Sequence, residues 1–280
     1  KSDTLRIVPL GGLGEVGKNM MVLEHGGDIL VVDTGLMFPE NDMWGVDYIY
    51  PDLSYLDGKK DRVRGIVVTH GHEDHTGAIC HVARHIEAPI YGTPLTCGLL
   101  EKKLREAKLY DAQKLNTVQA RESVSIGCFD VEFFHVCHSI PDSVGLGITT
   151  PVGLVVHSGD FKLDQTPVDD WPTDLAKIGE FSDRGVLALL SDSTNADQPG
   201  WTRSESIIDG ALDDVFREAE GRILVATFAS LISRVQQVIN ASHRHGRRVS
   251  MVGTSMVANS KMAQKLGYLL DPHGVLLPLD

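Results

Sequence analysis

The stretch His70-Gly71-His72-Glu73-Asp74-His75 directly follows Val63–Thr69, a short apolar run that predicts a buried strand. Three imidazoles and a carboxylate at this spacing suit zinc and related divalent ions. Ligands so close in sequence cannot all reach one ion without strain, but a loop whose side chains point in two directions can supply two ions. The alternative is a polar loop that happens to hold histidines, and four scarce residues at a strand end disfavour it. The stretch therefore predicts a binuclear metal site.

The H-x-H-x-D-H spacing is the signature of the metallo-β-lactamase superfamily, and the resemblance continues in order along the chain. Asp33 in V-V-D-T-G resembles the family's first motif, His138 in H-S-I-P-D-S its third, and Asp160 in H-S-G-D-F-K its fourth. The resemblance implies that Asp33 lies behind the ligands and holds the histidine loop in place. The implied ligands are His70, His72 and His138 for one ion, Asp74 and His75 for the second, and Asp160 as the bridge between both.

Each downstream motif also has a simpler interpretation when it is taken alone. Asp33 could be a turn residue before Gly35, and Asp160 could be a helix cap, since Ser158-Gly159-Asp160 is also typical of a turn. Their order behind the histidine stretch favours the metal site. Two divalent ions about 3.5–4 Å apart lower the pKa of a bridging water towards 7 and stabilise charge on the attacked centre and the leaving oxygen. We expect Zn²⁺, with Mn²⁺ or Mg²⁺ as alternatives, and Asp74 as a catalytic ligand.

Three features of the sequence point to nucleic acid as the substrate. Gly11–Met20 (G-G-L-G-E-V-G-K-N-M) and H-S-I-P-D-S resemble the ribonuclease J family. Ser191–Ala196 (S-D-S-T-N-A) resembles the acidic motif that opens the β-CASP insertion of RNA-processing nucleases, which implies a catalytic role for Asp192. The segments Thr227–Gln237 and Val252–Met256 resemble the inserted domain itself. Taken alone, Asp192 could be a polar residue at a strand end, and any parallel α/β module would explain the two later segments.

The resemblance implies a metal-dependent ribonuclease that hydrolyses RNA phosphodiester bonds as a 5′-exonuclease, an endonuclease or both. Two other classes remain open. A small-molecule metallo-hydrolase of the thioesterase or lactonase type would share the metal site, but we would not expect it to carry Asp192 and a separate domain. A non-catalytic RNA-binding scaffold would have lost metal ligands, whereas each ligand of the motifs within this chain is present.

Strands, helices and hairpins mix in the first part of the chain, which predicts an α/β fold in two sheets. By resemblance this is a metallo-β-lactamase αββα sandwich, and we place it at residues 1–199. In residues 200–280 the predicted strands and helices alternate as β-α-β-α, which is typical of a parallel sheet. By resemblance this region is the first part of a β-CASP domain. We expect that domain, and a last histidine ligand of the second ion, to continue beyond Asp280. The main expected elements are helices Asp74–His85, Pro94–Ala107, Leu231–His245 and Met256–Leu270, and strands Ile29–Asp33, Val186–Leu190, Ile223–Thr227 and Val249–Gly253.

Gly12-x-Gly14-x-x-Gly17 matches the dinucleotide-binding fingerprint, and Asp33 lies downstream of it. That fingerprint requires a helix immediately after the glycines. Here the next segment predicts a strand, the Gly26-Gly27 hairpin turn and another strand. A dinucleotide site is therefore disfavoured, and the glycines more simply let a loop pass close to the metal site.

The formal net charge of −12 is unusual for a nucleic-acid binder, which normally presents a basic face. Bound cations can reverse the local field, so RNA is still the expected substrate. The four cysteines form no C-x-x-C pair, and no apolar run approaches the roughly 20 residues that a membrane span needs. We expect a cytoplasmic homo-oligomer without membrane contact, and other RNA-decay proteins are candidate partners.

Overall fold

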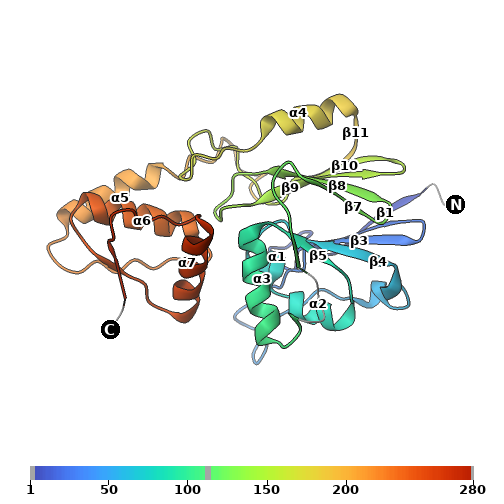
Figure 1. Cartoon of the computed structure of the whole chain (residues 1–280), viewed down its shortest axis with the longest axis horizontal. Helices are drawn as coiled ribbons and strands as arrows, with labels where there is room; N and C mark the ends of the chain where they lie inside the picture. Colours follow the sequence, from blue (N-terminus) through green and yellow to red (C-terminus); the bar gives the residue numbers. More distant parts are fainter. Residues whose placement is uncertain (1–3, 111–114, 279–280) are drawn as a thin grey trace. The chain divides into compact units, whose positions relative to one another are not determined.

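A computed structural model describes residues 4–110 and 115–278, and these fall into two units (Figure 1). The first unit comprises the described residues up to Val136, together with Asp142–Phe161 and Asp174–Ala196. The second takes Cys137–Pro141, Lys162–Thr173 and the chain from Asp197 onward. The domain limits inferred from the sequence, 1–199 and 200–280, stay a prediction beside this division. None of the helices in the described residues combines the length and apolar character needed to cross a bilayer.

The first sheet of unit one runs in the order β1-β2-β3-β4-β5-β6 among the described residues. Neighbours are antiparallel from β1 to β3 and parallel from β3 to β6. The hairpin predicted at Gly26-Gly27 is confirmed, since β2 and β3 pair on either side of it. The strands are β1 (Leu5–Gly11), β2 (Met20–His25), β3 (Asp28–Val32), β4 (Val63–Val67), β5 (Ile90–Gly92) and β6 (Leu115–Thr117).

The second sheet of unit one runs in the order β11-β10-β9-β8-β7. Its strand β9 was not expected, because Gly145 and Gly147 interrupt the apolar pattern. Both glycines make room for rings: a Cβ would lie 2.2 Å from the Phe134 ring at Gly145, and 2.3 Å from the Phe181 ring at Gly147. The strands are β7 (Ser123–Ile126), β8 (Phe129–His135), β9 (Val144–Thr150), β10 (Gly153–His157) and β11 (Val186–Leu190).

The two sheets stack face to face, and helices cover their outer faces (Figure 1). Side chains such as Leu30, Val67 and Phe133 form the buried layer between the sheets. On one outer side lie α1 (Glu73–Thr76), α2 (Ile79–His85) and α3 (Pro94–Glu106); on the other lies α4 (Leu175–Arg184). The expected αββα sandwich is confirmed. Burial of this apolar surface is the main stabilising term of the unit.

The single helix predicted over Asp74–His85 is wrong in one respect, because the structure breaks it into α1 and α2. The break falls at Gly77-Ala78, where the Ala78 N–H donates to the carbonyl of Thr34, at 2.8 Å. A Cβ on Gly77 would lie 2.3 Å from the Leu36 side chain. Tertiary contact with the segment after β3 therefore overrides the local helical pattern.

Among the described residues, the second unit holds three helices and a short parallel pair of strands. The predicted strand Ile223–Thr227 is wrong: no described strand pairs with it, and Leu224 is 90% exposed. A run of apolar residues becomes a strand only where a neighbour completes its hydrogen bonds. The strand predicted over Val249–Gly253 is shorter than expected. The elements are α5 (Ile207–Glu218), α6 (Ile232–Arg244), α7 (Thr254–Leu266), β12 (Val249–Ser250) and β13 (Leu276–Leu277).

A buried carboxylate on β2 gives the first sheet a pH-dependent contribution to stability. Glu24 accepts hydrogen bonds from Tyr55 at 2.6 Å, Arg62 at 2.6 Å and Lys59 at 3.2 Å. Burial raises the pKa of Glu24, but these three partners outweigh it and lower the pKa from 4.5 to about 2. Because the pKa falls on folding, the stabilisation is present above about pH 4.5 and is lost as the pH falls towards 2.

We expect Glu24→Gln to lower the free energy of unfolding by about 1–3 kcal/mol at pH 7, because the charge-assisted bonds are lost. The difference from the unaltered protein should shrink between about pH 4.5 and pH 2, where the carboxylate itself takes up a proton. Urea unfolding across this pH range measures both effects. The exposed Glu101→Gln is a control, and a Glu24→Gln penalty that is constant with pH would contradict the assignment.

Candidate metal centre

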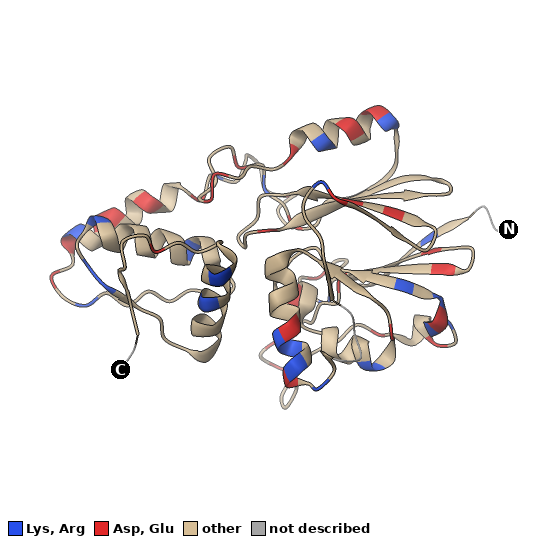
Figure 2. Cartoon of the chain, in the orientation of Figure 1, with Lys and Arg blue, Asp and Glu red and all other residues tan. Residues whose placement is uncertain are grey.

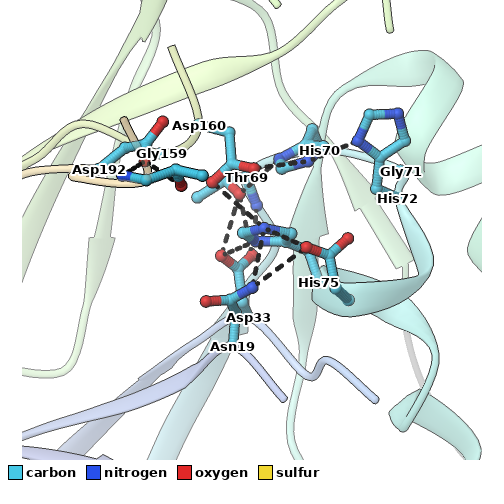
Figure 3. Close-up of polar contacts among 12 residues, drawn as sticks. Asn19, Asp33, Thr69, His70, Gly71, His72, His75, Gly159, Asp160 and Asp192 are labelled. Carbon is cyan, nitrogen blue, oxygen red and sulfur yellow. Dashed lines mark hydrogen bonds and ion pairs between the residues drawn. The ribbon is translucent and has the colours of Figure 1, made fainter. Parts of the chain in front are cut away.

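Four segments of unit one converge at the carboxyl ends of parallel strands. Asp33 follows β3 and the histidine stretch follows β4, in one sheet; Asp160 follows β10 and Asp192 follows β11, in the other. Strands that run parallel in a sheet end at the same edge, so residues distant in sequence meet there. Figure 3 shows Asp33 and Asp160 beside the imidazoles of His70 and His75, with Asp192 farther to the left.

His70 and His72 lie side by side at the start of the loop. Nε2 of His70 is 3.2 Å from Nδ1 of His72, and Thr69 Oγ1 is 3.1 Å from the other ring nitrogen of His70. Nε2 of His70 is also 4.0 Å from Asp160 Oδ2. The His70 ring is only 1% exposed. A buried imidazole with a carboxylate beside Nε2 and a hydroxyl at Nδ1 has the arrangement of a metal-binding histidine.

His75 is held between carboxylates. Its Nδ1 lies 2.8 Å from Asp33 Oδ2, while its Nε2 faces Asp160 Oδ1 at 3.3 Å and Asp74 Oδ2 at 3.5 Å. Burial lowers the pKa of His75, but Asp33, Asp160 and Asp74 outweigh it and hold that pKa well above its usual value. The imidazole therefore favours a positive charge at Nε2, which a proton or a metal cation can supply.

Asp33 connects β3 to the histidine loop. Its Oδ1 accepts from the backbone N–H of Thr69 at 2.8 Å, and both oxygens lie within 3.1 Å of Thr69 Oγ1. Its φ of 62° is in the left-handed region, which aspartate tolerates better than most residues. Asp33 thus fixes the loop backbone and the orientation of the His75 ring.

Asp74 completes the acidic side of this cluster. Burial raises its pKa, but the hydrogen bond and charge of His75 outweigh it, so the pKa of Asp74 lies below its usual value. The carboxylate is therefore ionised at neutral pH and available as a ligand.

The donor set fits a divalent cation. One atom each from His70, His75 and Asp160 can be chosen so that all lie within 4.8 Å of one another. Asp74 and Asp160 bring two carboxylates against the same imidazole nitrogen, an arrangement that requires either a proton on that nitrogen or a metal cation among the three groups. Imidazole with carboxylate is the ligand set of zinc and related metals. The individual ligand roles stay predictions, including that of His138, which lies on the loop between β8 and β9.

A cavity of about 820 Å³ opens beside this cluster. The glycine-rich segment between β1 and β2 forms part of its wall, and Asp74, Asp160 and Asp192 line it as well. Asp192 Oδ1 accepts from the backbone N–H of Thr194 at 2.9 Å and from its hydroxyl at 2.7 Å, which fixes that carboxylate. No helix follows the glycines, since β2 begins at Met20, so the dinucleotide site is not formed.

Sequence reasoning missed two residues of this cavity. Asn19 is not among the metal-binding residues that the sequence predicts, yet its side chain contacts both Asp74 and His75. In the string H-S-G-D-F-K only Asp160 is a predicted ligand, yet His157 also lines the cavity, and its Nδ1 accepts from the Gly159 N–H at 3.1 Å. Its Nε2 therefore carries the proton of the neutral ring. Burial is the main cause that lowers the pKa of His157. The sequence signal for His157 was its place three residues before Asp160.

The family model of the metallo-β-lactamase superfamily matches residues 13–212. The chain belongs to this superfamily, as its fold and the residues gathered at the strand ends indicate. The model described as "Ribonuclease J, beta-CASP domain" matches residues 220–280. Within the superfamily, this chain is similar to proteins named ribonuclease J.

Ribonuclease J of Synechocystis sp. is 47% identical to this chain, over 100% of the chain and 44% of the relative. Ribonuclease J of Helicobacter pylori is 44% identical, over 96% of the chain and 39% of the relative. Ribonuclease J2 of Bacillus subtilis is 42% identical, over 96% and 48%. The chain thus spans half or less of the length of these relatives. A crystal structure of an Enterococcus faecalis protein of unknown function shares the fold, with a TM-score of 0.68 at 14% identity, over 99% of this chain and 74% of that one.

Proposed function

We propose that the protein containing this chain is a metal-dependent ribonuclease that hydrolyses RNA phosphodiester bonds, as a 5′-exonuclease, an endonuclease or both. The observation that carries the proposal is the packing of Asp33, Asp74 and Asp160 around the buried His75, beside a large cavity. The relatives named ribonuclease J support RNA as the substrate. A cytoplasmic homo-oligomer acting with other RNA-decay proteins is part of the same proposal.

Two divalent ions, Zn²⁺ or alternatively Mn²⁺ or Mg²⁺, would supply hydroxide at neutral pH and stabilise the charge that develops on the phosphate. The residues of this chain would then have separate tasks. Asp33 keeps the His75 ring turned so that Nε2 faces the cavity side of the cluster. Asp74 and Asp192 are the proposed catalytic carboxylates. The proposed ligands are His70, His72 and His138 for one ion, Asp74 and His75 for the other, and Asp160 for both.

The acidic character of the chain is compatible with an RNA substrate only if cations take part. Figure 2 shows Lys or Arg interspersed with Asp or Glu along α3 and α4, and the cavity itself is lined by several carboxylates. A phosphodiester entering such a cavity would be repelled by the bare carboxylates. Bound divalent ions neutralise them and attract the phosphate oxygens directly.

The test is an activity assay on the full-length protein with 5′-monophosphorylated RNA and with a panel of thioesters and lactones. We expect RNA cleavage that a chelator abolishes and that added metal restores. Cleavage of the small esters without RNA cleavage would support the small-molecule hydrolase instead. RNA binding with no cleavage of either substrate class, in a metal-loaded protein, would support the scaffold.

The ligand assignment is tested by metal content. We expect His72→Ala in the full-length protein to lower the number of tightly bound ions per chain, because an imidazole that contacts His70 is removed. Elemental analysis after dialysis measures the ions. His85→Ala, on α2, is the matched control and should retain the metal. Equal metal content in His72→Ala and the unaltered protein would refute the assignment of His72.

A further inference from the structure

The glycine-rich segment between β1 and β2 is explained neither by a dinucleotide site nor by the proposed ligands. Gly12 and Gly14 both have left-handed backbones, with φ of 85° and 72°. The two positions differ in their surroundings. A Cβ on Gly12 would lie 2.4 Å from Oδ1 of Asn19, whereas a Cβ on Gly14 would have nothing within 4 Å. The space beside Gly12 is therefore occupied by the side-chain amide of Asn19.

That amide reaches two of the proposed ligands of the second ion (Figure 3). Nδ2 of Asn19 lies 3.3 Å from Asp74 Oδ2 and 3.1 Å from His75 Nε2. An amide nitrogen carries two N–H donors, so without a metal on Nε2 it can donate to both atoms at once. In the neutral ring that binds a metal, the His75 proton lies on Nδ1, where Asp33 accepts it at 2.8 Å. A metal ion at Nε2 would use the lone pair of that nitrogen, so the side-chain hydrogen bond that would remain in the loaded site is the one from Asn19 Nδ2 to Asp74 Oδ2.

The backbone of Asn19 is fixed by the same surroundings. Its N–H donates to the carbonyl of Asp74 at 3.0 Å, and its carbonyl accepts from the Gly35 N–H at 2.9 Å. Asn19 therefore contacts Asp74 through both its main chain and its side chain. A residue held in this way orients the ligands it touches, as the outer partners of metal ligands do.

We propose that Asn19 is a positioning residue for the second metal ion, and that Gly12 must be glycine because the Asn19 amide fills the place of its Cβ. The inference rests on the proposed function, since it requires Asp74 and His75 to be metal ligands. It gives the glycine-rich segment a role as the wall against which this amide packs.

The first test is Asn19→Leu, which keeps the branched shape and removes both donors. Zn²⁺ alone is titrated into the metal-free full-length protein by calorimetry. We expect the affinity for the second ion to fall by roughly 10- to 100-fold, while the first ion binds as before. Thermal unfolding of the metal-free variants checks folding. Asn19→Ser, which leaves space instead of filling it, should show the same selective loss. Asn116→Leu, a half-buried asparagine on β6, is the control.

The second test compares Gly12→Ala with Gly14→Ala, which both place alanine at a left-handed φ and differ in the contact with Asn19. We expect Gly12→Ala to lower the affinity for the second ion by as much as Asn19→Leu does. Gly14→Ala should bind Zn²⁺ with the affinities of the unaltered protein. An equal loss in both alanine variants would overturn the inference. So would unaltered affinities in Asn19→Leu and Gly12→Ala, or an equal loss at both ion sites. If the unaltered protein binds no Zn²⁺, the proposed metal centre fails instead.

Discussion

Asp74→Asn in the full-length protein is expected to abolish RNA cleavage, with turnover reduced by roughly 100-fold or more, while the fold stays intact. Asparagine has nearly the same shape but no negative charge. The pKa of Asp74 is held below its usual value by His75 against the effect of burial, so the charge is present at neutral pH. The side chain is 32% exposed and lies outside the apolar core. Its replacement should therefore weaken metal binding and leave the packing of the core unchanged.

Three measurements together decide this prediction: RNA turnover, metal content and thermal unfolding. Glu73→Gln is the neighbouring control, because the Glu73 carboxylate pairs with Lys103 at 2.8 Å. We expect this control to cleave RNA at nearly the original rate. If Asp74→Asn retained full turnover with unchanged metal content, Asp74 would be a structural residue.

Gly35→Ala is expected to be the most destabilising single methyl addition near the site. Its Cβ would lie 1.6 Å from the carbonyl oxygen of Asp74 and 2.6 Å from the backbone nitrogen of Asn19. Both neighbours are backbone atoms, and the Asn19 N–H is bonded to that same carbonyl at 3.0 Å. Relief of the clash would separate the loop after β3 from the histidine loop. We expect a loss of about 3 kcal/mol or more in the free energy of unfolding.

Urea unfolding of the metal-free protein measures this loss without any contribution from bound metal. Gly27→Ala is the matched control, since Gly27 has no left-handed φ and a Cβ there would meet nothing within 4 Å. We expect it to change stability by no more than about 0.5 kcal/mol. Similar unfolding midpoints for the two alanine variants would show that the loop moves aside easily.

Local patterns in the sequence were sufficient where one segment decides its own structure. The apolar runs before Asp33 and His70 form strands, the Gly26-Gly27 hairpin forms, and the mixture of strands and helices gives an α/β fold with two sheets. Local patterns failed where a distant partner decides. The helix over residues 74–85 breaks at a contact with Thr34, and the run Ile223–Thr227 stays outside any described sheet.

The sequence by itself therefore determined the fold class and a candidate set of metal-binding residues, because their types and order resemble one superfamily. Only the tertiary structure decided which atoms meet. The contact of His75 with Asp33 joins residues 42 positions apart, and that with Asn19 spans 56. The order of strands in the sheet decides which of these distant residues come into contact. The spacing of residues along the sequence does not reveal that order. For the same reason Asn19 could be recognised only after β2 and the histidine loop had been brought together.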